Sequence, residues 1–301
     1  GKVRWRKAVN VGDTATLRAS TDTVYLLAEH TIQAYQLATG ARRWVYGPAD
    51  VQSFFLDINA LTTDTLYVTE VEGSNHAEDL VAFDTASGQP RWTFHTGADV
   101  LMAATAQNAY SAELGASSDL TQQAPPQSLR AFAAHGGGTP LWSLPVTQFG
   151  SFGAMQIGPD GTLYLNGASG LFALHTADGT TKWMTPNPIA GQNAAGGPLG
   201  IDSPLAYANF NGQEMVAVHV ADGSVAWKHP FAQPSDSAGQ QLPCASNGRV
   251  VLQWTVNNSA SGHVQVLNSQ TGNVAWNVGD KTKDLSNQSQ VLCDSQSLYL
   301  V

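Results

Sequence analysis

The densest group of side chains that could do chemistry is an acidic stretch in the first third of the chain. It reads Glu70-Val-Glu72-Gly-Ser-Asn-His76-Ala-Glu78-Asp79 and holds four carboxylates and one imidazole within ten residues. Carboxylate oxygens are the ligands that calcium prefers. The stretch lacks the Asp-x-Asp-x-Asp-Gly start of an EF-hand loop, however. We therefore interpret it as a solvated loop between two strands and predict no metal site there.

The cysteines and two of the histidines are the other candidates. Cys244 and Cys293 lie 49 residues apart, so they cannot form a vicinal disulfide and are too few for a cysteine zinc site. We interpret them as small buried residues of two inner strands. A bridge between them stays open, because it depends on the separation of their Cα atoms. His175 and His219 occupy equivalent turn positions, where we expect each ring to cap backbone amides.

The sequence shows no arrangement typical of an enzyme. It contains no phosphate-binding loop, no dinucleotide fingerprint and no Ser, His and Asp in a recognisable nucleophile motif. The run Gly136-Gly137-Gly138 precedes no helix and is interpreted as a hairpin turn. We therefore predict no catalytic residues.

Composition excludes several classes of partner. Of 301 residues, 43% are hydrophobic and only 12% are charged, and the formal net charge is −9. Such a chain lacks the basic surface that nucleic acid or an anionic membrane requires. No apolar run approaches the 18 residues needed to span a bilayer, so we predict no membrane insertion by this segment. The low charge content favours an extracytoplasmic location, with any signal or anchor outside this segment.

A repeat marked by tryptophan runs through the whole chain. Seven tryptophans recur every 39 to 50 residues, and a glycine stands four positions before each. Each period also contains a second turn and two further apolar runs, which predicts four short strands. The tryptophans are Trp5, Trp44, Trp92, Trp142, Trp183, Trp227 and Trp276, and the glycines are Gly1, Gly40, Gly88, Gly138, Gly179, Gly223 and Gly272.

Four strands per 40 to 50 residues is typical of a β-propeller blade. We predict an all-β propeller of four-stranded antiparallel blades, in which each tryptophan packs between neighbouring blades. Seven blades fit the count if N- and C-terminal strands close the last blade together. Eight blades, one of them outside the segment, are the alternative. Residues 1–301 would then be a single propeller domain of a longer protein.

The repeat resembles the tryptophan-docking motif of quinoprotein (PQQ-like) β-propellers. The pattern is Ala-x-Asp-x-x-Thr-Gly-x-x-x-Trp, and its copy from Ala82 to Trp92 keeps the aspartate, as Asp84. Other copies replace that aspartate by Gln36, His175, His219 and Asn268. The resemblance covers nearly the whole chain.

The resemblance implies one of three functions. Quinoprotein dehydrogenases oxidise alcohols or sugars with PQQ and calcium. They hold PQQ between a tryptophan and a disulfide of adjacent cysteines. The lipoprotein of the barrel-assembly machinery uses its propeller to bind proteins, and further members are sensor or interaction modules. Because no vicinal cysteines occur here, we predict no PQQ, no other cofactor and no enzyme. The first interpretation is a non-catalytic binding or sensing module. The alternatives are an envelope scaffold resembling the barrel-assembly lipoprotein and a PQQ-dependent dehydrogenase.

One face of the predicted disc is expected to meet a protein or small ligand. The enlarged acidic loop, a longer insertion from Ser111 to Ser128 and the connections between units all fall on this face. Aromatic residues there could anchor a ligand, or could cap the central channel, which we favour. The candidate residues are Phe54, Phe55, Glu70, Glu72, His76, Glu78, Asp79, Phe149 and Phe152.

Overall fold

A computed structural model describes most of the chain as short β-strands joined by turns. The chain divides into two compact units, unit 1 (residues 1–146) and unit 2 (residues 147–301). The described residues are 3–9, 15–28, 30–48, 52–73, 77–95, 99–113, 128–150, 152–189, 196–210, 213–231, 241–255, 262–278, 291–293 and 298–300.

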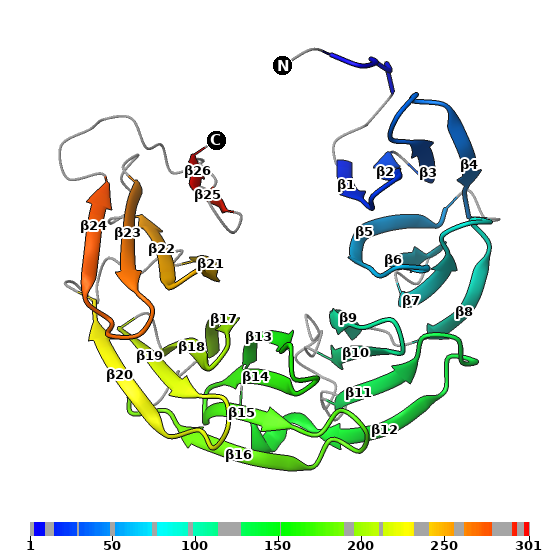
Figure 1. The fold of residues 1–301 in the computed structure, drawn as a ribbon. Helices are drawn as coiled ribbons and strands as arrows, with labels where there is room; N and C mark the ends of the chain where they lie inside the picture. Colours follow the sequence, from blue (N-terminus) through cyan, green and yellow to red (C-terminus); the bar gives the residue numbers. More distant parts are fainter. Residues whose placement is uncertain are drawn as a thin grey trace. The chain divides into compact units, whose positions relative to one another are not determined.

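Unit 1 contains three four-stranded antiparallel sheets, which Figure 1 shows in blue to green. Within each sheet the hydrogen-bonded order follows the chain order, as expected for a meander closed by short turns. The strands are β1 (Ala15–Ala19), β2 (Thr23–Ala28), β3 (Thr31–Gln36), β4 (Arg42–Tyr46), β5 (Phe54–Leu61), β6 (Thr65–Glu72), β7 (Ala77–Asp84), β8 (Pro90–His95), β9 (Asp99–Ala104), β10 (Asn108–Glu113), β11 (Ser128–Ala133) and β12 (Pro140–Pro145).

Unit 2 repeats the same architecture. It begins with a short 3-10 helix, η2, that starts at the end of unit 1, and then forms three four-stranded sheets and a two-stranded one. Its elements are η2 (Val146–Gln148), β13 (Phe152–Ile157), β14 (Leu163–Gly167), β15 (Gly170–Leu174), β16 (Thr181–Pro186), β17 (Gly196–Asp202), β18 (Leu205–Phe210), β19 (Glu214–His219), β20 (Val225–Pro230), β21 (Gln241–Ser246), β22 (Arg249–Thr255), β23 (Gly262–Asn268), β24 (Val274–Val278), β25 (Val291–Cys293) and β26 (Leu298–Leu300).

The six four-stranded meanders confirm the predicted all-β blades. The register of the third and fourth strands repeats from blade to blade, with Ala82 opposite Trp92 in one blade and Ala217 opposite Trp227 in another. A register shift directly after each of these pairs leads into the turn that joins the third strand to the fourth. Seven blades, closure by the two ends of the chain, and a single domain stay predictions. No helix in the described part of the chain has the length and apolar character to traverse a bilayer.

The second strands β2, β14 and β18 are buried on both faces, because blades pack against their neighbours within a unit. In β6, Leu66 and Val68 join a cluster with residues of β2 and β3, while Tyr67 on the opposite face packs toward Trp92 and Phe132. Alternation between two buried faces explains why the middle strands read as nearly continuous apolar runs.

Within each unit, Trp44, Trp92, Trp183 and Trp227 lie between neighbouring blades. The indole Nε1–H of Trp44 donates to the carbonyl of Thr85, at 2.9 Å, and that of Trp227 donates to the carbonyl of Ser269, at 2.7 Å. Four of the rings cover the repeat glycine of the following blade: Trp5 covers Gly40, Trp44 covers Gly88, Trp183 covers Gly223 and Trp227 covers Gly272. Gly88, at a φ of +70°, has the left-handed conformation that glycine adopts readily, and a Cβ atom there would overlap the Trp44 ring. Ring and turn are therefore matched in both shape and hydrogen bonding.

Trp5 makes the same contacts although no described strand contains it. Its Nε1–H donates to the carbonyl of Leu37 at 2.8 Å, and a Cβ atom at Gly40 would lie 2.7 Å from its Cδ2. The N-terminal segment thus packs on the first blade as a preceding blade would. Pairing of this segment with the C-terminal strands stays a prediction.

Candidate functional site

The acidic stretch lies on strands rather than in a loop, which corrects the sequence interpretation. β6 extends to Glu72 and β7 begins at Ala77, so only residues 73–76 connect them. Glu70 is directly opposite Asp79, and Val71 is opposite Glu78. Val71 is buried on the same face as Tyr67 and Thr69, at the period of two typical of a strand, which favours continued pairing. We call Glu70, Glu72, Glu78 and Asp79 the acidic edge.

A row of ionisable side chains crosses three strands at this edge. Asp79 of β7 is opposite Glu70 of β6 on one side and opposite His95 of β8 on the other. Directly opposed residues of antiparallel strands place their side chains on the same face of the sheet. Glu70, Asp79 and His95 therefore share a face, and Glu72 lies two residues further along β6 on that face.

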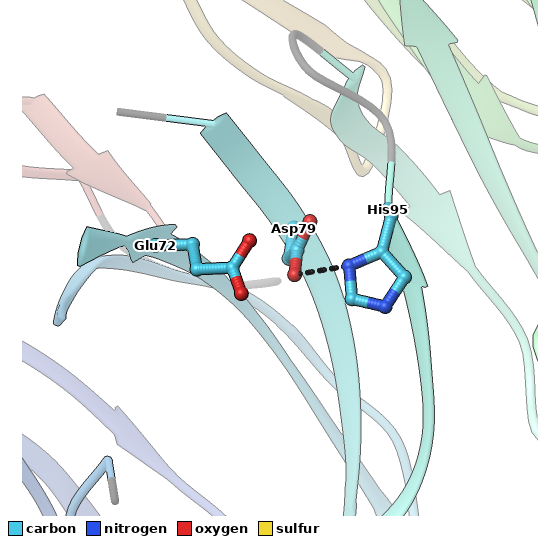
Figure 2. Close-up of side chains that lie close together, drawn as sticks. All are labelled: Glu72, Asp79 and His95. Carbon is cyan, nitrogen blue, oxygen red and sulfur yellow. Dashed lines mark ion pairs between the residues drawn. The ribbon is translucent and has the colours of Figure 1, made fainter. Parts of the chain in front are cut away.

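The side chains of Glu72 and His95 turn toward Asp79 from opposite sides (Figure 2). His95 Nδ1 lies 2.7 Å from Asp79 Oδ2, and one ligand atom from each of the three residues lies within 4.8 Å of the others. The Asp79 side chain is only 7% exposed, whereas that of His95 is 74% exposed. A buried carboxylate is thus reached from the surface by two exposed side chains.

Several carboxylates lie close together at this edge, and the pKa values of two of them are raised. Burial raises the pKa of Asp79; the charge and hydrogen bond of His95 oppose the rise, and the charge of Glu72 adds to it. Burial, followed by the charges of Asp79 and Glu72, raises the pKa of Glu70. Asp79 Oδ1 is buried and has no hydrogen-bond partner among the described residues. The acidic edge is therefore suited to a positively charged group from outside.

The described aromatic candidates divide into half-buried and buried positions. Phe54 is half-buried, at the start of β5, and its ring meets the edge of His30. Phe55 is 2% exposed and packs against Tyr46 and Phe83. Phe149 is fully buried against Phe172 in unit 2. The expectation that Phe55 and Phe149 meet a partner is corrected accordingly, because both rings fill apolar cores.

The remaining candidates differ in how much of them the structure describes. Glu70 and Glu78 are both half-buried, and Glu78 lies on the other face of β7. Phe152 lies in β13, but its side chain is outside the described part of the structure. His76, like most of the insertion from Ser111 to Ser128, lies outside the described residues.

His95 is the residue that the sequence analysis missed. It shows no ligand spacing in the sequence, because 16 residues separate it from Asp79. The repeat nevertheless contains the signal. Ala82 pairs with Trp92, and counting three residues outward along both strands brings Asp79 opposite His95.

The turn aspartate and its replacements behave differently from the expectation. Asp84 accepts hydrogen bonds from the amides of Ala86 and Ser87, as an Asx turn does. In the copies that carry His175 and His219, Asp178 and Asp222 accept a different turn amide, that of Thr180 and Ser224, and among the described residues neither imidazole is bonded to a turn amide. This corrects the capping role predicted for the two histidines. Cys244 and Cys293 lie in β21 and β25, but their side chains are outside the described set.

A hollow of about 320 Å³ in unit 2 is lined by Pro159, Asp160, Ser203 and Val220. Asp160 is the only acid among the described residues of the lining, and its carboxylate already accepts hydrogen bonds from the amide and hydroxyl of Thr162. Although burial opposes it, these bonds and the charge of Lys182 hold the pKa of Asp160 below its ordinary value. The carboxylate of Asp160 is therefore occupied by hydrogen bonds within its own turn, and the hollow contains no free reactive group among the described residues.

A family model described as "Outer membrane protein assembly factor BamB" matches residues 1–185 and 127–301, which together cover the chain. No curated protein sequence matches significantly. BamB from Moraxella catarrhalis is 18% identical, with a TM-score of 0.58, over 93% of this chain and 76% of that one.

Two other solved structures illustrate the range of proteins with this fold. The computationally designed Ika8 protein is 13% identical, with a TM-score of 0.55, over 92% of this chain and 88% of that one. A quinohemoprotein alcohol dehydrogenase from Pseudomonas putida HK5 is 12% identical, with a TM-score of 0.57. The match covers 94% of this chain and 61% of the dehydrogenase. At these identities the likeness concerns the fold alone.

Proposed function

The chain belongs to the family described as outer membrane protein assembly factor BamB, and from this premise we propose that it is a non-catalytic protein-binding scaffold of the bacterial envelope. The observation that carries the proposal is the family match, which extends over the whole chain. This favours the scaffold over the sensing module that the sequence analysis put first. Assembly of outer-membrane proteins is the process in which we propose that it acts.

The acidic edge is the docking surface that we propose. It combines exposed Glu72 and half-buried Glu70 beside the buried carboxylate of Asp79 with half-buried Glu78 on the other face of β7. Half-buried Phe54 begins the neighbouring strand and can add apolar contact. Complementary charge accelerates association and selects partners. We therefore propose that the partner presents lysine or arginine side chains to this edge.

The proposed location is outside the cytoplasm, as the family description and the low charge content both suggest. The structural likeness to a quinohemoprotein dehydrogenase does not favour an enzyme, because it concerns the fold alone. The proposal therefore predicts that PQQ with calcium produces no substrate-dependent dye reduction by this protein.

The test is capture of partners by the full chain in its native bacterium. We expect cross-linking to recover proteins of the outer-membrane barrel-assembly machinery, identified by mass spectrometry. Deletion of the gene should lower the amount of heat-modifiable, folded outer-membrane barrels. Failure of both effects would contradict the proposed function.

A pair of charge reversals tests the docking surface separately. The double variant Glu72→Lys, Glu78→Lys should reduce capture at least fivefold, because it reverses the charge that the partner meets. Asp178→Lys, which reverses an exposed turn acid of unit 2, is the matched control and should leave capture unchanged. Equal capture by all three proteins would show that the partner binds elsewhere.

A further inference from the structure

We propose that Glu72, Asp79 and His95 form a binding site for a divalent transition-metal ion of the zinc type. The inference does not depend on the proposed function. It rests on three donors that neighbouring strands bring together, two oxygen and one nitrogen. Carboxylate and imidazole are both established zinc ligands.

The unpartnered oxygen of Asp79 points to a missing cation. The Asp79 side chain is 7% exposed, and its Oδ1 is buried without a hydrogen-bond partner in the described structure. Buried polar atoms in native proteins normally have partners, and an orphaned one requires an explanation. His95 occupies only Oδ2. A metal ion would give the carboxylate the positive partner that it otherwise lacks.

The distances suit a small ion after modest adjustment. The three ligand atoms lie within 4.8 Å of one another, whereas donors around a tetrahedral zinc ion lie about 3.4 Å apart, given bonds of about 2.0–2.2 Å. Glu72 and His95 are exposed and can move inward, while Asp79 is held by its burial. An ion held by both oxygens of the Asp79 carboxylate would displace the proton between His95 Nδ1 and Asp79 Oδ2, which lie 2.7 Å apart, and would also give Oδ1 a partner.

The donor set of two carboxylates and one imidazole disfavours calcium and magnesium. Calcium takes six to eight oxygen ligands, and magnesium keeps near-octahedral oxygen coordination. Imidazole nitrogen instead suits zinc, copper, iron and nickel. Three protein donors leave a fourth position open, which a water molecule or a donor from a bound partner can occupy.

Titration calorimetry of the full chain, without a histidine tag, tests the proposal with zinc chloride as the probe. We expect one saturable site that Glu72→Gln and His95→Gln each weaken at least tenfold. Both residues are exposed, so neither change should unfold the protein. Cobalt(II) should give the intense visible absorption of a tetrahedral site in the wild type, and that band should be lost in both variants.

His135→Asn is the matched control. His135 Nε2 pairs with Asp64 Oδ2 at 3.1 Å, also at a largely exposed position in unit 1, but without membership in the three-donor cluster. Its removal should leave the saturable site intact. No zinc binding by the wild type, unchanged affinity in Glu72→Gln and His95→Gln, or an equal loss in His135→Asn would each overturn the proposal.

Discussion

Two aspartates on the same strand, five residues apart, meet opposite conditions. At one end of β7, Asp84 Oδ1 accepts the amide of Ser87 at 2.8 Å, and Oδ2 lies 2.6 Å from Arg91. These bonds lower the pKa of Asp84 to about 2. At the other end, Asp79 leaves Oδ1 unpartnered, and its burial raises its pKa. The turn end is internally satisfied, whereas at the acidic edge one carboxylate oxygen of Asp79 has no partner among the described residues.

This difference indicates that the turn end of the blade contributes to stability, whereas the acidic edge is available for binding. The repeat supplies Asp84, Gly88 and Trp92 together, so hydrogen bonding and packing are complete there. Glu72 and Asp79 stand outside the repeat motif and interact at the cost of mutual repulsion. Proteins commonly accept local strain of this kind at functional positions. Four substitutions test this division of roles between the two ends of the strand, and they follow in order of decreasing expected effect on stability.

Trp92→Ala should destabilise the protein most. Trp92 is 5% exposed, stacks on Phe132 and donates to the carbonyl of Ala134 at 3.0 Å. Loss of a buried tryptophan costs about 3–5 kcal/mol. Urea unfolding measures the change, with Leu141→Ala, an exposed apolar residue of the next blade, as the control. A loss no larger than that of the control would show that the ring does not hold the blades together.

Gly88→Ala should rank second. The left-handed backbone and the overlap of a Cβ atom with Trp44 together should cost about 2–3 kcal/mol. Gly137→Ala is the matched control, because nothing lies within 4 Å of a Cβ atom at that glycine. Thermal unfolding of the two variants decides the matter. Equal midpoints would refute the idea that the glycine is required by the docked indole.

Asp84→Asn should cost about 1–2 kcal/mol at pH 7. Because the folded pKa of about 2 lies below the unfolded value, the charged group stabilises the fold above about pH 4. That stability is lost as the pH falls toward 2. The difference in unfolding free energy between wild type and variant, measured from pH 7 to pH 2, should therefore shrink. A difference that is constant with pH would assign the effect to geometry instead of charge.

Glu72→Gln should have the smallest effect on stability. The side chain is exposed, and its removal as a charge relieves repulsion with Asp79 and Glu70. We expect the free energy of unfolding, measured in urea with a chelator present, to change by no more than about 0.5 kcal/mol. Destabilisation comparable to that of Asp84→Asn would mean that the acidic edge is part of the structural framework.

The sequence predicts the blades well because their determinants are local and repeated. The spacing of tryptophan and glycine indicates each outer hairpin, and apolar runs such as Thr65 to Val68 indicate the inner strands. The ends of β6 and β7 are harder to predict. Glu70, Glu72 and Asp79 have polar side chains typical of a loop, yet strand pairing continues through them.

The site was predicted only in part, for the same reason. Its acidic members are adjacent in the sequence, but His95 arrives through a strand pairing that the spacing of ligands alone does not reveal. Burial of Phe55 and Phe149 depends on packing between blades, which side-chain type does not determine. Pairing register and packing are therefore the two things that a single sequence leaves undetermined here.

The most direct test of the division between the two ends compares partner capture and thermal stability in Glu72→Lys and Asp84→Asn. We predict that Glu72→Lys captures the barrel-assembly machinery less well than the wild type while its Tm stays at the wild-type value. Asp84→Asn should have a lower Tm but capture normally below its unfolding temperature. Wild-type capture by Glu72→Lys, or reduced capture by Asp84→Asn while it is folded, would contradict the assignment of binding to the acidic edge.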